Sequence, residues 1–417
     1  MEEGPASDPL PTPTQAWNLV ACQWTMPEAR HEATPLLEAV GRVTAHAVHS
    51  PCDSPPFDRA AMDGYAVRAA DLAGSRAGET LRVVGEVRMG QPAELDLDAG
   101  QAIWVATGSM IPPGADAVVN VERTRTVAGQ VCVEGPVKLG DHISRRASDL
   151  PKGAAVLGAG RRLRPQDAAV LASLGLAHVL VMRKPRVAIL LTGDELCLPG
   201  ESLAPGQIYT SNGYALAGQI AQAGGNAVVW PLLPDDLGAI VAAFQEALAT
   251  ADLILISGGS SVGKRDLTAQ ALEATAGTRL LVEGVAAKPG RPSIVATVGD
   301  RLVIGIPGNP MAAMISFAMF GEPALRALLR LSAEETAAPR GGGRLVARLT
   351  APLTSRRGRQ EYIPVRLEPA GDRGWGAAPV SGTSAGLAGM VYADGLITVA
   401  PEVDCLTAGK EVEVTVF

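Results

Sequence analysis

Apolar and polar positions follow two periods along this 417-residue chain. Four apolar residues at helical spacing predict an amphipathic helix that ends before Pro51: Leu36, Val40, Val43 and Ala47. From about residue 80 to 140, short apolar runs between Gly and Pro turns predict a small β unit. Helical spacing returns in PQDAAVLASLGL (165–176), so the β unit is expected to be an insertion in a helical domain.

The pattern changes again between residues 186 and 330. Strand-like runs alternate there with helical runs: RVAILL, AVVWPLL, DLILIS and RLVIGI are the strand-like ones. This rhythm predicts a doubly wound parallel sheet with helices on both faces. Beyond a GGG linker, further strand-like runs such as RLVARLTA and EVEVTVF predict a small C-terminal β barrel or sandwich.

These patterns divide the chain into five predicted parts. They are a disordered tail (1–14), a discontinuous helical domain (15–52 and 142–183), an inserted β domain (53–141), an α/β domain (184–332) and a C-terminal β-barrel domain (340–417).

Composition narrows the function classes. Lys and Arg total 36 against 43 Asp and Glu, and aromatic residues make up 4%, which argues against a nucleic-acid binder. The chain has no basic, apolar N-terminal signal and no run of about 18 apolar residues, so we expect a cytoplasmic protein without a membrane span. Five cysteines without C-x-x-C spacing support neither a disulfide framework nor a zinc knuckle.

Candidate chemistry lies where the predicted parallel strands end. Ligands of open parallel sheets bind beyond the carboxyl ends of the strands. Each of the four strand-like runs is followed by Gly, Pro or acidic residues: TGDE (192–195), PDD (234–236), SGGSSVG (257–263) and PGNP (307–310). Ordinary turns and helix caps use the same residues. Four such loops at one edge nevertheless favour a binding site.

The glycine loop nearly matches two known motifs. GGSSVGKR (258–265) lacks the hydroxyl residue that would hold Mg²⁺ in a P-loop, because Arg265 stands there. The elbow G-x-S-x-G, with Ser261 as nucleophile, needs a later His, and all five histidines precede it. A backbone cradle for phosphate or another oxyanion remains. Asp266 would either cap the next helix or bind a metal or another ligand.

Other loops carry isolated charges. KPGRP (288–292) presents two cations, which suit an oxyanion or simply form a solvated loop. Asp63 lies among apolar residues and needs a partner or a cation, whereas Thr107 reads as an ordinary turn hydroxyl. Asp63, Glu195, Asp235 and Asp266 together suggest Mg²⁺, and the lack of a His/Cys cluster argues against zinc.

Seven strings, taken in order, resemble the molybdopterin molybdenumtransferase family, which includes the gephyrin E domain. They are PPFDRAAMDGYAVRAADL (55–72), ATGSMIPPGADAVV (106–119), LTGDEL (191–196), GQIYTSN (206–212), SGGSSVGKRD (257–266), KPGRP (288–292) and GIPGNP (305–310). The resemblance implies an elongated homodimer and a molybdopterin-binding α/β domain. It also implies Mg²⁺-dependent insertion of molybdate into adenylylated molybdopterin with release of AMP. Molybdopterin adenylyltransferase and recipient molybdoenzymes are the implied protein partners.

The resemblance also implies residue roles. Catalytic residues would be Asp63, Thr107, Glu195, Asp235 and Asp266, of which Glu195 and Asp266 would hold Mg²⁺. Molybdopterin and its adenylate would contact Asp149, Ser257, Gly258, Gly259, Ser260, Ser261, Gly263, Pro307, Gly308, Asn309 and Pro310. Molybdate would bind near Lys288, Arg291 and Ser384. The loop with Asp63 and Thr107 would complete the pocket of the partner subunit.

The chain also departs from the family pattern. Gly284 and Pro364 stand where many members carry cations, and Arg357, Arg359 or Arg366 could compensate. These departures support a second hypothesis, a non-catalytic paralogue that binds molybdopterin or the cofactor as a carrier or scaffold. A P-loop-like nucleotidyl-transferring enzyme, supported only by GGSSVGK, is the third.

Overall fold

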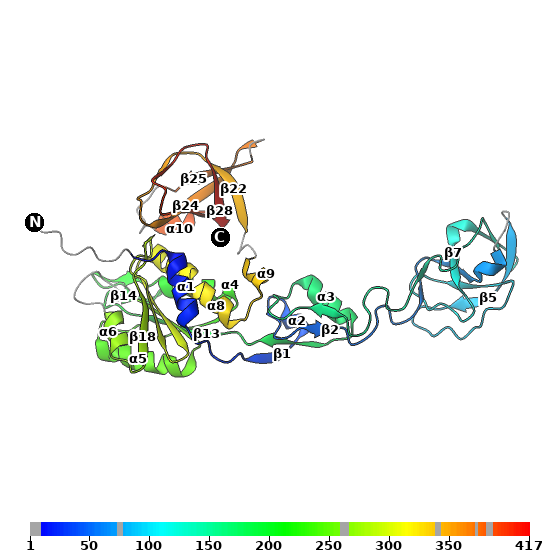
Figure 1. Ribbon diagram of the computed structural model, residues 1–417, viewed down its shortest axis with the longest axis horizontal. Helices are drawn as coiled ribbons and strands as arrows, with labels where there is room; N and C mark the ends of the chain where they lie inside the picture. Colours follow the sequence, from blue (N-terminus) through cyan, green and yellow to red (C-terminus); the bar gives the residue numbers. More distant parts are fainter. Residues whose placement is uncertain (1–9, 73–77, 259–266, 338–342, 372–373, 381–386) are drawn as a thin grey trace, which may run out of the picture.

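The computed structural model describes residues 10–72, 78–258, 267–337, 343–371, 374–380 and 387–417. Figure 1 shows an elongated molecule. The α/β domain and the C-terminal barrel lie together at one end, the inserted β domain lies at the other, and a slender middle domain joins them.

The α/β domain is built on a six-stranded sheet. Its strand order is β16 (Asn226–Val229), β13 (Arg186–Leu191), β17 (Leu253–Ser257), β21 (Arg301–Ile306), β20 (Ile294–Val298) and β18 (Thr278–Glu283). The first four strands are parallel, and β20 runs antiparallel to both of its neighbours. The predicted fold class is confirmed, with β20 as the exception to a purely parallel sheet.

Helices cover both faces of this sheet, because alternate strand residues are apolar on both sides. Ile189 packs with one helix layer and Leu190 with the other. The first layer contains α1 (Pro13–Gln23), α4 (Asn212–Ala223), α7 (Pro310–Ser316) and α8 (Glu322–Leu328), and the second contains α5 (Leu237–Thr250) and α6 (Leu267–Glu273). The run Pro310–Leu328 is long and apolar enough to cross a membrane, but 67% of its most apolar window is buried, as in a core helix.

Helix α1 lies in a different domain from the one expected. The sequence pattern assigned residues 15–52 to the helical domain. Ala16, Val20 and Trp24 instead complete the α/β core, and the Trp24 indole donates a hydrogen bond to the Asp300 carbonyl over 2.9 Å. The helix also begins at Pro13, within the predicted tail.

The middle domain is less helical than expected. The predicted helix through Leu36 and Ala47 is wrong: α2 spans only Leu36–Ala39, and Gly41 follows in a left-handed conformation at φ +83°. Val43 and Thr44 then form β-bridges with Arg162 and Val181. Long-range backbone pairing has replaced the local helix that the apolar spacing alone favoured.

The rest of the middle domain is made of short paired elements. They are β1 (His31–Pro35) with β12 (His178–Met182), β2 (Val48–His49) with β11 (Ala155–Leu157), and helix α3 (Pro165–Ser173), which the sequence predicted. Strands β3 (Arg59–Ala60) and β10 (Ile143–Ser144) form the connection to the inserted β domain.

Two β domains complete the chain. The inserted one has the order β7 (Ala117–Asn120), β4 (Gly64–Val67), β6 (Gln101–Val105), β5 (Glu79–Val87), β9 (Gln130–Val133) and β8 (Thr124–Val127). The C-terminal barrel runs β24 (Gln360–Pro369), β25 (Trp375–Pro379), β22 (Arg344–Leu349), β28 (Glu411–Val416) and β26 (Gly395–Val399), and a β24–β26 pairing closes it. The predicted C-terminal barrel is thereby confirmed.

Short elements complete these domains, and one of them connects two domains. Strand β19 (Ala287–Lys288) of the α/β domain pairs with β24 and so ties the barrel to the sheet. The others are β14 (Leu196–Cys197) with β15 (Ile208–Tyr209), β23 (Leu353–Thr354) with β27 (Cys405–Leu406), α9 (Ala333–Ala337), α10 (Leu387–Val391), the 3₁₀ turns Ala69–Leu72 and Val121–Arg123, and the π turn Phe317–Gly321.

Candidate functional site

Four of the predicted loops meet at one edge of the α/β sheet. Leu191, Ser257 and Ile306 are register neighbours at the carboxyl ends of β13, β17 and β21. The loops that begin at Thr192, Gly258 and Pro307 therefore start side by side. Thr192 also forms a parallel bridge with Leu233, which brings the loop with Asp235 to the same edge.

The basic loop KPGRP reaches this edge from the other side of the sheet. Strand β20 begins at Ile294, opposite Gly305 near the end of β21, and Glu283 at the end of β18 also pairs with Ile294. The loop between β18 and β20, which carries Lys288 and Arg291, therefore emerges at the carboxyl edge. Both cations are exposed. The edge thus presents cations at one end and carboxylates at the other.

A cavity flanks the basic end of this edge. It measures about 360 Å³ and lies between α6 and β18. Glu283 and Ile294, two of its lining residues, mark the point where it meets the carboxyl edge.

Asn212 locks two of the loops together. Its Nδ2 donates to the Ser257 hydroxyl and to the Gly308 carbonyl, each over 2.8 Å. Asn212 is the first residue of α4 and is 7% exposed, and Ser257 is 2% exposed. The Ser257 hydroxyl therefore serves the internal structure of the edge. The sequence reasoning missed Asn212 as a site residue. The only signal for it was its place at the end of GQIYTSN.

The start of the glycine loop is packed against β13. Gly258 has φ +114°, and a Cβ there would lie 2.1 Å from the Thr192 carbonyl oxygen. Thr268 donates to the Gly258 carbonyl over 3.1 Å. Among the described residues, the buried Thr192 hydroxyl has no hydrogen-bond partner. Of the predicted site residues, Gly259, Ser260, Ser261, Gly263, Asp266 and Ser384 lie outside the part of the chain that the structure describes.

Two exposed carboxylates, those of Glu195 and Asp235, belong to this edge. The Glu195 carboxylate lies over Gly193, where an added Cβ would be 2.6 Å from Oε2, and the Asp235 N–H donates to Asp194 Oδ1 over 3.1 Å. Within the described ranges, no three His, Cys, Asp or Glu residues gather as a metal cage. Mg²⁺ commonly takes one or two carboxylates and completes its shell with water and substrate phosphates. The donors present fit such a partial site.

A second group of predicted residues gathers in the inserted β domain. Thr107 donates to Asp63 Oδ1 through its backbone N–H (2.6 Å) and through its hydroxyl (2.8 Å). These bonds, the backbone one foremost, hold the pKa of Asp63 below its usual value. Asp149 lies beside the β3 connection between the inserted β domain and the middle domain, where the Arg59 guanidinium approaches its carboxylate at 3.9 Å. Thr107 is thus a specific partner of Asp63 as well as a turn residue.

The residues of the α/β edge and those around Asp63 lie at opposite ends of the molecule. Asp63 directly precedes β4 and Thr107 follows β6, both in the β domain, which the middle domain separates from the α/β edge (Figure 1). A pocket that uses both groups therefore needs a second subunit.

The arginines suggested as substitute cations are already paired with acids. Arg359 lies 2.7 Å from the buried carboxylate of Glu361, and Arg357 lies 3.0 Å from Asp404. Arg366 is bound to Glu368. Lys288 and Arg291 thus remain the cations that the described part of the edge offers to an anion.

Comparisons with known proteins match this architecture over almost the whole chain. Three family models match in order: the MoeA N-terminal region (domain I and II) over residues 12–175, the probable molybdopterin binding domain over 188–327, and the MoeA C-terminal region (domain IV) over 346–417.

Relatives and solved structures agree with these models. A molybdopterin molybdenumtransferase from Nostoc sp. is 37% identical over 71% of this chain and 69% of its own length. Molybdopterin molybdenumtransferase 2 from Mycobacterium tuberculosis is 34% identical over 93% of this chain and 96% of its own. The crystal structure of a molybdopterin biosynthesis MoeA protein from Pyrococcus horikoshii superimposes with a TM-score of 0.83 at 34% identity, covering 98% of this chain and 99% of that one. The chain belongs to the molybdopterin molybdenumtransferase family.

Proposed function

We propose that this protein inserts molybdenum, supplied as molybdate, into adenylylated molybdopterin and releases AMP. The convergence of five loops on one sheet edge, with cations at one end and carboxylates at the other, carries the proposal. An anionic substrate and a second anion must be held side by side for this reaction. An edge with both signs of charge is suited to that task.

Lys288 and Arg291 are the proposed molybdate ligands, together with Ser384. Both cations are exposed, and the described structure pairs neither with a carboxylate. A guanidinium and an ammonium bind oxyanions through charge-assisted hydrogen bonds. The loop Pro307–Pro310 and the glycine loop are proposed to hold the pterin and the phosphates, with Asp149 contributing from the partner subunit.

Mg²⁺ is proposed to bind Glu195 and Asp266, with Asp235 nearby. When bound, it would neutralise negative charge on the pyrophosphate as AMP leaves. The chain's own residues orient the two substrates, and no side chain acts as a covalent nucleophile. A molybdate oxygen attacks the adenylyl phosphorus and the phosphoanhydride bond breaks, so that the terminal phosphate stays on molybdopterin. The bond between molybdenum and the attacking oxygen breaks as the two dithiolene sulfurs bind molybdenum, and that oxygen leaves in AMP.

We further propose that the active unit is a cytoplasmic homodimer. Asp63 and Thr107 of one subunit would then complete the edge of its partner, since neither can reach its own. Molybdopterin adenylyltransferase would supply the substrate, and recipient molybdoenzymes would accept the product.

One assay tests the reaction. The protein is incubated with adenylylated molybdopterin, Mg²⁺ and molybdate, and AMP and bound molybdenum are measured. We expect stoichiometric AMP with retained molybdenum, and a strong loss of both in Glu195→Gln and Asp266→Asn. Glu246→Gln, an exposed acid on α5, is the matched control and should retain activity. Full activity in Glu195→Gln and Asp266→Asn would contradict the assignment.

Mixed dimers test the shared pocket. Asp63→Asn and Glu195→Gln subunits, each inactive alone, would regain about a quarter of wild-type activity when mixed, because half of the dimers are hetero and each restores one of two pockets. No recovery after subunit exchange would argue against a pocket built from two chains.

The carrier hypothesis keeps one specific observation in its favour. Gly284 and Pro364 replace two expected cations, and Arg357, Arg359 and Arg366 are paired with acids. Binding of adenylylated molybdopterin without AMP release would support a carrier. Turnover of a nucleoside triphosphate would instead support the P-loop-like enzyme.

A further inference from the structure

One arginine bridges the middle domain and the α/β domain, at the contact between these domains that we call the joint. The Arg162 guanidinium donates through Nη1 to the Gly41 carbonyl over 2.9 Å and through Nη2 to the Ala223 carbonyl over 3.1 Å. Gly41 belongs to the middle domain, and Ala223 is the last residue of α4. Arg162 is half-buried, so these bonds are partly shielded from water.

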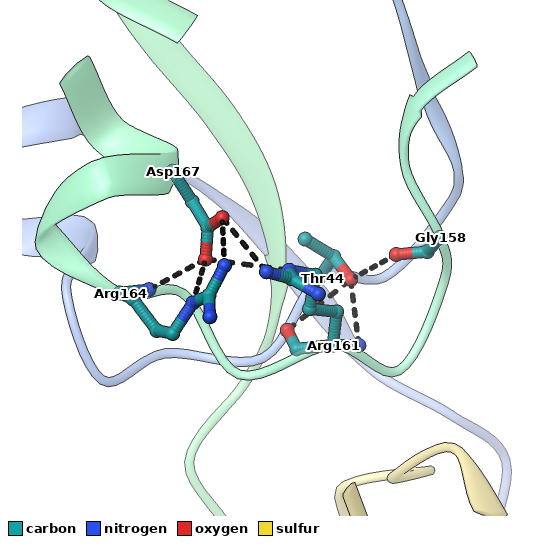
Figure 2. Close-up of polar contacts among 5 residues, drawn as sticks. All are labelled: Thr44, Gly158, Arg161, Arg164 and Asp167. Carbon is teal, nitrogen blue, oxygen red and sulfur yellow. Dashed lines mark hydrogen bonds and ion pairs between the residues drawn. The ribbon is translucent and has the colours of Figure 1, made fainter. Parts of the chain in front are cut away.

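The turn that carries Arg162 is fixed from inside the middle domain (Figure 2). Thr44 Oγ1 donates to the Gly158 carbonyl over 2.7 Å and accepts from the Arg161 N–H over 3.0 Å. The Asp167 carboxylate, 5% exposed, accepts from Arg161 (2.9 Å) and from Arg164 (3.2 Å). Arg162 lies between these two bound arginines in sequence, and its side chain crosses to α4 instead.

Helix α4 connects this joint to the candidate site. Its first residue, Asn212, locks the loops of β17 and β21, and its last residue, Ala223, accepts from Arg162. Twelve residues of α-helix span about 18 Å. The helix ends at Gly224 in a left-handed cap (φ +95°), where a cation stabilises the terminal carbonyls.

A second contact closes the joint. The Ser332 N–H donates to the Gly160 carbonyl over 2.9 Å. Gly160 has φ +73°, and a Cβ there would lie 2.4 Å from the Arg330 carbonyl oxygen. Beside it, Val43 and Met182 pack on Leu329. The joint is narrow, so a few contacts decide its angle.

We propose that Arg162 is a positioning residue that fixes the angle of the arm (residues 31–182) against α4, and thereby presents Asp63 and Thr107 to the partner subunit. The inference rests on the proposed homodimeric pocket. Asp63 and Thr107 lie in the β domain at the far end of the arm (Figure 1), so a small rotation at the joint becomes a larger displacement there. The edge residues on the α/β domain would not move.

The direct test measures the arm angle in the full-length protein. Spin labels at Val127→Cys on β8 and Glu246→Cys on α5, in a background without the exposed native cysteines, report the distance between the two ends. Labelled chains are diluted into unlabelled protein. We expect Arg162→Met to shift or broaden the distance distribution, and Gly160→Ala to do so through the clash of its added Cβ with the Arg330 carbonyl oxygen. Arg164→Met, which changes a neighbouring arginine whose side-chain hydrogen bonds run to Asp167 within the arm, should not.

Kinetics complete the test. Arg162→Met should lower kcat by up to about a hundredfold, as a misplaced group does. The affinity for adenylylated molybdopterin, held mainly by the edge, should stay within about twofold. Unchanged distances in both joint variants, or altered distances with an unchanged kcat, would overturn the proposal. A wild-type protein that releases no AMP would instead count against the proposed function, which the distance measurement does not require.

Discussion

Asn212→Ala is the most informative single change at the sheet edge. It removes an amide that is 7% exposed and that donates two hydrogen bonds of 2.8 Å, to Ser257 and to Gly308. Each lost bond costs about 1 kcal/mol, and a buried group left without its partner costs about 1–3 kcal/mol. The Ser257 hydroxyl is buried, so the loss of its partner has the larger cost. Gly308 is exposed, so water replaces the lost hydrogen bond to its carbonyl. We therefore expect a loss of about 2–3 kcal/mol.

Calorimetry of the full-length protein measures this loss. For a domain of this size it corresponds to a fall in Tm of about 5–10 °C in the α/β transition. AMP release should fall as well, since the loops of β17 and β21 lose their common anchor. The matched control is Asn226→Ala, an exposed asparagine on β16, expected to change stability by less than about 0.5 kcal/mol. Asn212→Ala with wild-type Tm and wild-type activity would refute this account of the edge.

Three further changes probe the fold and the site. Gly258→Ala should lower the free energy of unfolding, measured by urea titration, by more than about 3 kcal/mol, because its Cβ would lie 2.1 Å from the Thr192 carbonyl oxygen. Gly218→Ala is the control: it has open space on α4 and should stabilise the protein by about 0.5–1 kcal/mol in the same titration. Asp167→Asn should lower the free energy of unfolding by about 2–3 kcal/mol at neutral pH. Burial alone would raise the pKa of Asp167, but the hydrogen bonds from Arg164 and Arg161 outweigh that effect and lower the pKa. That stabilisation is complete above the ordinary aspartate pKa of 3.8 and is lost as pH falls towards the lower folded-state pKa. The difference in Tm between wild type and Asp167→Asn should therefore narrow in acid. A difference that stays constant with pH would contradict this origin. Lys288→Gln should raise the KM for molybdate about tenfold, the equivalent of one charged hydrogen bond, while Lys410→Gln in the barrel should leave it unchanged.

The amino-acid sequence alone determined the α/β core and the edge on which the site lies. Along β13, Val187, Ile189 and Leu191 face one helix layer and Ala188 and Leu190 face the other, so an unbroken apolar run specifies a strand buried on both sides. Parallel strands must end at one edge, so the loops after RVAILL, DLILIS and RLVIGI had to meet.

Only the tertiary structure decided which surfaces these elements bury against. The spacing of Leu36 to Ala47 is helical, but bridges from Val43 to Arg162 and from Thr44 to Val181 replace the helix after Ala39. The apolar residues of α1 pack into the α/β core as well as a segment nearer to it in sequence would. The periodicity of apolar residues shows that one face of an element is buried, but it does not show which other element covers that face.

The site depends on the same long-range choices. Asn212 meets Gly308 across 96 residues, and Arg162 meets Ala223 across 61. Such polar pairs need one donor and one acceptor within about 3 Å, and no local pattern marks which of many loop residues will be brought that close. The apolar pattern therefore determined the core and its edge, because burial depends on each residue's own chemistry. Packing decided the anchors and the arm angle, because those depend on where distant parts of the chain come to lie.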